Sequence, residues 1–501
     1  MRSCRGAFPV VARQVSSLTA VLVAGPTWLA AQATSPPDSA LARMDTTTNR
    51  IDATLPAGRV IRQITSRADT NQRYALYLPS AFTRDRRWPI LFLLDPRGRA
   101  LIPLQRFQPV AERLGYIAIS SYNTLSDGPS EPNYNAMNAM LDDVQRSLPV
   151  DSRRFYLVGF SGTTRFAWEV DRQLPGTIAG IIGAGAAVPG GRAWMRSNIG
   201  KSSPVLFGTI GTLDPNYEEL RSFDAELDTI GALHHVERFD GGHQWPPTEL
   251  STRAVEWLEL QAMRRGLKPR QQPWIDSLYA AWLARAARSD SAGDASAAAR
   301  AYRLLRADFE ALTDVSAAAV RSSALEQDPR VRRARSVEAA ISERDWKLGS
   351  ALVTFAGELK ATSSPPSIDQ ARKRLELDAL RREAARTDDS TASVAARRAL
   401  ERIFTHLSFY VPREFFDARR YAHAAYALQV ARLIKPDDGG ACFWQARALA
   451  QLGDKANALA ALECAGASKQ VSVETIEGDP LLAPLRSDAR YEAVVRRLKG
   501  G

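Results

Sequence analysis

The sequence predicts two folds in tandem: a mostly parallel sheet flanked by helices over residues 56–265, then an all-α domain of helical repeats over residues 274–501. Apolar runs of strand length alternate with helical patterns through the first region, as is typical of a parallel sheet covered on both faces. Beyond Trp274 no strand-like alternation remains, and Ala, Leu and Arg recur at helical spacing. Near the C-terminus a pattern of small and apolar residues recurs after 34 residues, which indicates stacked helix pairs.

The expected strands differ in their burial. Arg59–Ile64 and Arg73–Leu78 have strand patterns, with clear alternation of side chains in the second, so we expect them to form an antiparallel edge. Trp88–Leu94 is a continuous apolar run, which favours a strand buried on both faces. Further strands are expected at Tyr116–Ser121, Phe155–Gly159, Thr177–Gly183, Pro204–Ile210 and His234–Phe239. Helical patterns separate them at Leu104–Leu114, Ala136–Ser147, Tyr217–Gly231 and Ser251–Arg264. Gly266–Pro273 is typical of a hinge between domains.

The repeat near the C-terminus involves six residues. Ala424, Leu428 and Ala431 recur 34 residues later as Ala458, Leu462 and Ala465. This pattern resembles the tetratricopeptide family over residues 400–498, and the resemblance implies antiparallel helix pairs and a protein partner for the repeats. Cys442 and Cys464 are equally distant in sequence from the turn at Gly453, so they should lie level on neighbouring helices. Both a disulfide and a pair of buried thiols fit this placement.

The N-terminus has the pattern of an export signal. Arg2, Arg5 and Arg13 precede the apolar stretch Leu18–Ala24, and Ala31–Ala33 has the small-x-small form of a cleavage site. We therefore predict a signal peptide over residues 1–33 and a flexible segment over residues 34–55, followed by a periplasmic or extracellular protein. An uncleaved membrane anchor is the alternative, and the brevity of the apolar run argues against it.

The composition indicates which classes of ligand the protein is expected to bind. The net charge is +11, but Arg residues are scattered among acidic residues on expected helices, as in Arg330–Arg335, and few aromatic residues accompany them. This favours solvated helix faces over a nucleic-acid site, and leaves attraction to anionic membrane surfaces or acidic polymers open. Three Cys and five His are too few for a metal cluster, so we predict no metal. We also expect no organic cofactor.

A strand followed by a serine and a helix carries the predicted chemistry. Phe155–Gly159 leads into Ser161 and then a helical pattern, the context of a nucleophile elbow. Crowding there demands small residues two positions before and after the serine. Gly159 fits, whereas Thr163 departs from the usual glycine, and we expect Gly162 to relieve the crowding.

The partners of Ser161 follow in the order that such elbows require, the acid first and then the base. Asp214 comes directly after a buried strand, and His243 lies in the Gly-rich loop after the last strand. We predict a triad in which His243 takes the Ser161 proton and Asp214 orients the ring. Asp214 as a mere helix start is the alternative role. Asp224, Asp228 and Asp240 are poorer third members, and His234 and His235 fall within a strand and should be structural.

An oxyanion hole needs two backbone N–H groups. Gly162 is the expected first donor. The second should come from the loop after Trp88–Leu94, where Pro96 has no N–H, so Arg97 is expected and Gly98 is the reserve. An ion pair between Asp95 and Arg99 would hold this loop.

Four segments resemble one family: Tyr74–Pro79, Val150–Tyr156, Gly159–Gly162 and Gly241–Pro246. Together they are similar to the esterase branch of the α/β-hydrolases, which includes polyhydroxybutyrate depolymerases, feruloyl esterases and dienelactone hydrolases. The resemblance implies an α/β-hydrolase fold over residues 56–265 and a serine hydrolase that cleaves carboxylic esters through an acyl-enzyme. No cap domain is visible between Ile182 and Pro204, so a bulky or polymeric ester is expected to fit. A serine peptidase of the same fold and an inactive scaffold with partner-binding repeats are the alternatives.

Overall fold

The computed structural model describes residues 51 and 55–499, except residues 201–202, 388–389 and 469. The predicted signal peptide, residues 1–33, and nearly all of the segment 34–55 lie outside these residues. The described chain forms two compact units that divide between Ala339 and Ala340. In the described residues, no helix combines the length and the apolar character needed to cross a membrane.

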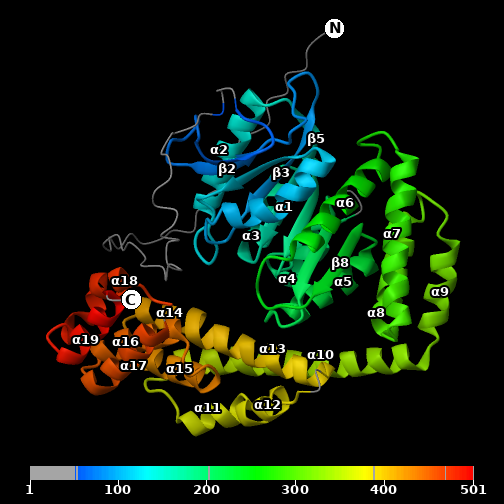
Figure 1. The fold of residues 1–501 in the computed structure, drawn as a ribbon. Coiled ribbons are helices and arrows are strands. Elements are labelled where there is room, and N and C mark those ends of the chain that lie inside the picture. Colours follow the sequence, from blue (N-terminus) through cyan, green and yellow to red (C-terminus); the bar gives the residue numbers. More distant parts are fainter. Residues whose placement is uncertain (1–50, 52–54, 201–202, 388–389, 469, 500–501) are drawn as a thin grey trace. The chain divides into compact units, whose positions relative to one another are not determined.

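The first unit is built on an eight-stranded sheet with the order β1-β2-β4-β3-β5-β6-β7-β8 (Figure 1). The strands are β1 (Val60–Thr65), β2 (Arg73–Tyr77), β3 (Trp88–Leu94), β4 (Ile117–Ser121), β5 (Val150–Phe160), β6 (Ile178–Ala184), β7 (Val205–Gly211) and β8 (His234–Phe239). Strand β2 runs antiparallel to both β1 and β4, and all other neighbours are parallel. The predicted mostly parallel sheet with an antiparallel edge is therefore confirmed.

Helices cover both faces of this sheet. One face packs on α1 (Leu101–Leu114) and α6 (Thr248–Arg264), where Leu91 and Val158 of the sheet join Phe107 and Trp257 in one core. The other face packs on α2 (Glu131–Ser147), α3 (Gly162–Gln173) and α5 (Tyr217–Ile230) through a second apolar core. The central strands have apolar side chains on both faces because each face is covered by helices. This explains why β3 is a continuous apolar run that is buried at every position.

Between β6 and β7, the described residues form only the short helix α4 (Gly191–Asn198). This agrees with the absence of a cap domain expected from the sequence for the same stretch.

The first unit also contains α7 (Gln272–Ser291), α8 (Ala295–Phe309), α9 (Ser316–Glu326) and the start of the next helix. Ile275 of α7 and Phe309 of α8 are buried in one core with Leu260 and Met263 of α6. The sequence places a domain boundary at residues 266–273, whereas the compact units divide within α10 (Pro329–Ala361). Helical spacing identifies these helices, but tertiary packing decides which unit they join.

The second unit is helical in its described residues. After the end of α10 it contains α11 (Ile368–Arg374), α12 (Leu377–Ala384), α13 (Thr391–Thr405), a π-helical turn (His406–Tyr410), α14 (Val411–Asp417), α15 (Tyr421–Ile434), α16 (Gly439–Gln451), α17 (Lys455–Ser468), α18 (Val473–Gly478), a 3₁₀ helix (Pro480–Leu485) and α19 (Ala489–Lys499). The six residues of the repeat pattern lie at matching positions of α15 and α17, and each is 0% exposed. The period therefore marks the packed faces of these helices, while a tetratricopeptide type of repeat stays a prediction.

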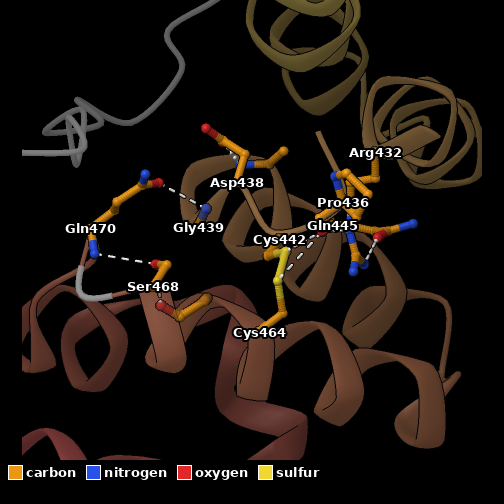
Figure 2. The surroundings of a disulfide bond; sticks show 11 residues. Arg432, Pro436, Asp438, Gly439, Cys442, Gln445, Cys464, Ser468 and Gln470 are labelled. Carbon is orange, nitrogen blue, oxygen red and sulfur yellow. Dashed lines mark hydrogen bonds between the residues drawn. A yellow bond between two sulfur atoms is a disulfide. The ribbon is translucent and has the colours of Figure 1, made fainter. Parts of the chain in front are cut away.

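A disulfide joins α16 to α17 (Figure 2). The Cα atoms of Cys442 and Cys464 are 5.9 Å apart, so the two residues do lie level across the turn at Gly453. Of the two possibilities that the sequence left open, the structure has the bonded pair. The start of α16 approaches α17 closely as well, since a Cβ on Gly439 would lie 1.8 Å from Ser468 Oγ.

Candidate active site

Ser161 occupies a sharp turn between β5 and α3. Its backbone has φ +55° and ψ −128°, a region that residues with a side chain rarely adopt. A Cβ on Gly159 would lie 2.6 Å from the backbone of Thr163, so strand and helix nearly touch at this point. A strained serine between a strand and a closely packed helix is the geometry of a nucleophile elbow.

Thr163 is accommodated by hydrogen bonds. The side chain is completely buried, and its hydroxyl accepts from Phe160 N–H at 3.0 Å. The same oxygen lies within donating distance of the carbonyl oxygens of Leu94 and Phe160. The hydroxyl therefore links the ends of β3 and β5 beneath the serine, which a glycine could not do.

Gly162 has a different role from the expected relief of crowding at Thr163. A Cβ on Gly162 would lie 2.5 Å from the Cβ of Ser126. The missing side chain therefore makes room for the loop after β4, which passes next to the serine.

The structure brings Ser161, His243 and Asp214 together. His243 Nδ1 lies 2.8 Å from Asp214 Oδ2, and His243 Nε2 lies 2.9 Å from Ser161 Oγ. A carboxylate only accepts hydrogen bonds, so Nδ1 carries the proton and Nε2 is left to accept from the serine hydroxyl. The Asp214 side chain is 1% exposed and that of His243 is 32% exposed, so the acid is enclosed while the ring reaches solvent.

Close backbone contacts hold the loops of this triad. The second oxygen of Asp214 accepts from Asn216 N–H at 2.8 Å. Leu213 N–H donates to Gly241 O at 2.8 Å, which ties the loop of the acid to the loop of the base. Gly185, which the sequence analysis did not single out, has φ +66°, and a Cβ there would lie 3.1 Å from the ring of His243 and 3.2 Å from Asp214 Oδ2. A side chain at this position would therefore crowd His243 and Asp214 and strain the backbone.

Aromatic side chains support the ring of His243. Phe160 lies 4.7 Å from His243 and 5.5 Å from Trp245 between ring centroids. Trp245 Nε1–H donates to the buried Asp95 at 2.8 Å. This contact connects the histidine loop to the loop after β3.

Asp95 also forms hydrogen bonds within the loop after β3, and these involve the predicted second donors of the oxyanion hole. It forms the expected ion pair with Arg99 at 3.0 Å. Its carboxylate also accepts from Arg97 N–H at 2.8 Å, and its carbonyl oxygen accepts from Gly98 N–H at 3.2 Å. Both predicted second donors are therefore engaged, because an Asp at the start of the loop folds back on the N–H groups that follow. In contrast, Gly162 N–H has no hydrogen-bond partner among the described residues.

The other candidates have structural contacts. His234 Nε2 lies 3.1 Å from Asp224 and 3.6 Å from Asp228, so the two carboxylates that the sequence disfavoured hold this ring. His235 Nδ1 lies 2.7 Å from Asp308 Oδ2 in the core. The side chains of His, Cys, Asp and Glu in the described part of the chain form no group that could hold a metal ion.

Similarity to known proteins is found among solved structures. No family model matches the chain, and no curated protein matches it. Among solved structures, the chain is similar to the fluorophosphonate-binding serine hydrolase FphF from Staphylococcus aureus, with 15% identity, 40% of this chain, 99% of that chain and a TM-score of 0.34. It is also similar to a feruloyl esterase module from Clostridium thermocellum, with 14% identity, 41% of this chain, 90% of that chain and a TM-score of 0.32. Dipeptidyl peptidase 4 from Porphyromonas gingivalis matches with 13% identity, 39% of this chain, 34% of that chain and a TM-score of 0.30.

Proposed function

We propose that this protein is an exported serine hydrolase that cleaves carboxylic esters, with Ser161 as the nucleophile. One observation carries the proposal: an unbroken chain of contacts runs from Asp214 through His243 to Ser161, at 2.8 and 2.9 Å. A serine hydroxyl is a weak nucleophile near neutral pH unless a base removes its proton. The eight-stranded sheet and the strained turn at Ser161 fit the α/β-hydrolase architecture and support this class.

The mechanism has two half-reactions. His243 Nε2 takes the proton of Ser161 as the oxygen attacks the ester carbonyl, and Asp214 stabilises the resulting imidazolium. The imidazolium then protonates the leaving alcohol, so an acyl group remains on Ser161. In the second half, His243 takes a proton from water, which attacks the acyl-enzyme and releases the carboxylic acid.

Negative charge that develops on the carbonyl oxygen needs N–H donors. Gly162 N–H follows the nucleophile directly and is unpartnered among the described residues, so it is the first donor of the proposal. Arg97 N–H serves as the second donor only when Asp95 releases it, because these groups are hydrogen-bonded at 2.8 Å. A small movement of the loop after β3 on substrate binding would complete the hole.

The setting of the site favours a bulky acyl ester. The imidazole of His243 is partly exposed, and only α4 lies between β6 and β7 among the described residues. Export is proposed from the signal-peptide pattern of residues 1–33. The disulfide in the second unit is of the kind that persists in oxidising compartments and supports the same proposal. For the helices of the second unit we propose a protein partner.

A panel of p-nitrophenyl esters of increasing acyl length, together with a fluorophosphonate probe, tests the proposal. Wild type should hydrolyse the esters and be labelled, and Ser161→Ala should lose labelling and at least about 10⁴-fold in kcat. Ser291→Ala, at an exposed serine of α7, is the matched control and should be unchanged.

Two results would contradict the proposed esterase activity and favour one of the alternatives. Cleavage of peptide amides without ester turnover would favour the serine peptidase. A folded wild type that shows neither labelling nor turnover would favour the inactive scaffold.

A further inference from the structure

The first unit contains a cavity of about 170 Å³ that is separate from the triad. It lies between the sheet at β7 and β8, the first turns of α5, and helices α7 and α8. None of the three triad residues lines it. Pockets for drug-sized ligands measure roughly 300 to 1,000 Å³. This cavity is smaller, so it suits a ligand smaller than a typical drug.

Arginines dominate the polar lining. The five that line the cavity are Arg221, Arg238, Arg285, Arg300 and Arg303. Four of them have carboxylate partners: Arg221 with Glu218 at 2.6 Å, Arg238 with Glu338 at 2.8 Å, Arg285 with Glu237 at 2.6 Å, and Arg303 with Asp228 at 3.5 Å. These partners neutralise most of the charge around the cavity.

Arg300, on α8, is the exception. No described residue forms a hydrogen bond or an ion pair with its guanidinium, and the residue is half-buried. Burial, and then repulsion by the charge of Arg238, lower the pKa of Arg300 from its ordinary value, and the charge of Glu338, which is paired with Arg238, offsets them only in part. A half-buried cation without a direct hydrogen-bond partner is costly in a folded protein, and a bound anion lowers that cost.

Part of the cavity wall is apolar. Ile210 of β7, Trp282 of α7 and Leu305 of α8 contribute side chains to it. A fully hydrated inorganic ion gains little from such a wall, whereas an organic anion buries its apolar part there.

We propose that this cavity binds a small organic carboxylate, with its charged group on Arg300 and its apolar part against Trp282. A planar guanidinium matches a carboxylate with two parallel hydrogen bonds, which adds direction to the charge attraction. The proposal does not depend on the chemistry at Ser161, and its test measures binding rather than turnover.

Calorimetric titration of the full chain with benzoate tests this site, with benzyl alcohol as the uncharged ligand of similar shape. Wild type should bind benzoate at one site and should bind benzyl alcohol far more weakly. Arg300→Met should weaken benzoate binding at least tenfold, in line with the loss of a hydrogen bond between charged groups. Arg300→Lys keeps the charge but loses the planar fork and should fall between the two. Arg306→Met, at an exposed arginine of the same helix, is the matched control and should bind as wild type does.

The melting temperature in benzoate-free buffer reports the fold of each variant. Because Arg300→Met removes an uncompensated charge, it should melt at or above the temperature of wild type. Four results would overturn the proposal: no benzoate binding to wild type, equal binding of benzyl alcohol, equal affinity in Arg300→Met, or binding of inorganic phosphate in place of benzoate.

Discussion

Raising the pH is expected to weaken the attachment of α8 to the sheet, because it removes the charge of His235. This residue of β8 is buried, stacked on Phe207 with ring centroids 4.7 Å apart. Its Nδ1 lies 2.7 Å from Asp308 Oδ2 of α8, and its Nε2 lies 3.3 Å from Glu237. Burial disfavours the imidazolium, but Asp308 and Glu237 outweigh it and raise the pKa of His235 to about 9.

The sign and size of the effect follow from linkage. Folding raises the pKa of His235, so the charged ring stabilises the native state. This stabilisation is fully present below pH 6.5, the ordinary pKa, and is lost as the pH rises through about 9. The difference between these values corresponds to about 3 kcal/mol of unfolding free energy. The first unit should therefore lose about that amount between pH 6 and pH 10.

Asp308→Asn isolates this contribution. The asparagine oxygen can still accept from Trp257 Nε1, which donates to Asp308 at 2.6 Å, but its amide cannot favour the imidazolium. The variant should be less stable than wild type at pH 6 and should lose much less stability toward pH 10. Groups that titrate in both proteins cancel in the comparison.

Histidine NMR gives a direct measurement. The chain has five His, so labelling the imidazole carbons yields few resonances, and His235→Gln assigns the one of interest. We expect its midpoint near pH 9 in wild type and well below that in Asp308→Asn. A midpoint at or below 6.5 in wild type, or identical pH profiles of stability for both proteins, would refute the reasoning.

Three further predictions concern single contacts. Thr163→Val keeps the shape but leaves Phe160 N–H unpaired, so it should cost about 1 to 3 kcal/mol in denaturant unfolding, whereas Thr163→Ser should retain most of the stability. Gly185→Ala puts a methyl group against the triad and should lower kcat about tenfold or more in the ester assay, while Gly176→Ala, at an equally left-handed glycine with open space around it, should leave kcat unchanged. The double variant Cys442→Ser, Cys464→Ser should lose roughly 3 kcal/mol, seen as earlier denaturant unfolding of the second unit, and an unchanged midpoint would contradict the bonded pair.

The sequence predicts the sheet and the proximity of Ser161, Asp214 and His243 because both depend on strong, local signals. Apolar runs such as β3 mark central strands, and the loops after β5, β7 and β8 must emerge at the same edge of a parallel sheet. Chain order then places Ser161, Asp214 and His243 at that edge. The alternation of strands and helices along the chain therefore predicts that these three residues lie close together, although it gives no distances between them.

The sequence could not predict the contacts that depend on more than one loop. The position of Arg97 after β3 predicts an oxyanion donor, but the Asp95 carboxylate accepts its N–H, and this depends on how the loop folds back. Gly185 follows β6 and gives no signal in the sequence, although the triad packs directly against it. The sequence also does not predict that the two units divide within α10. The sequence around Phe309 has helical spacing, but this spacing does not reveal which helices the side chain packs against.

Thr163 and Asp95 make contacts that connect neighbouring loops close to Ser161 and His243. Thr163 stands where a glycine is usual, and its hydroxyl ties β5 to β3 by bonds that no glycine could make. Asp95, at the start of the loop after β3, forms an ion pair with Arg99 and accepts a hydrogen bond from the indole of Trp245. Each side chain thus makes polar contacts next to Ser161 or His243, and we expect such contacts to stiffen the turn that carries the residue. Such stiffening favours catalysis that depends on preorganised groups, and it restricts the freedom of the loop after β3 to supply a second oxyanion donor.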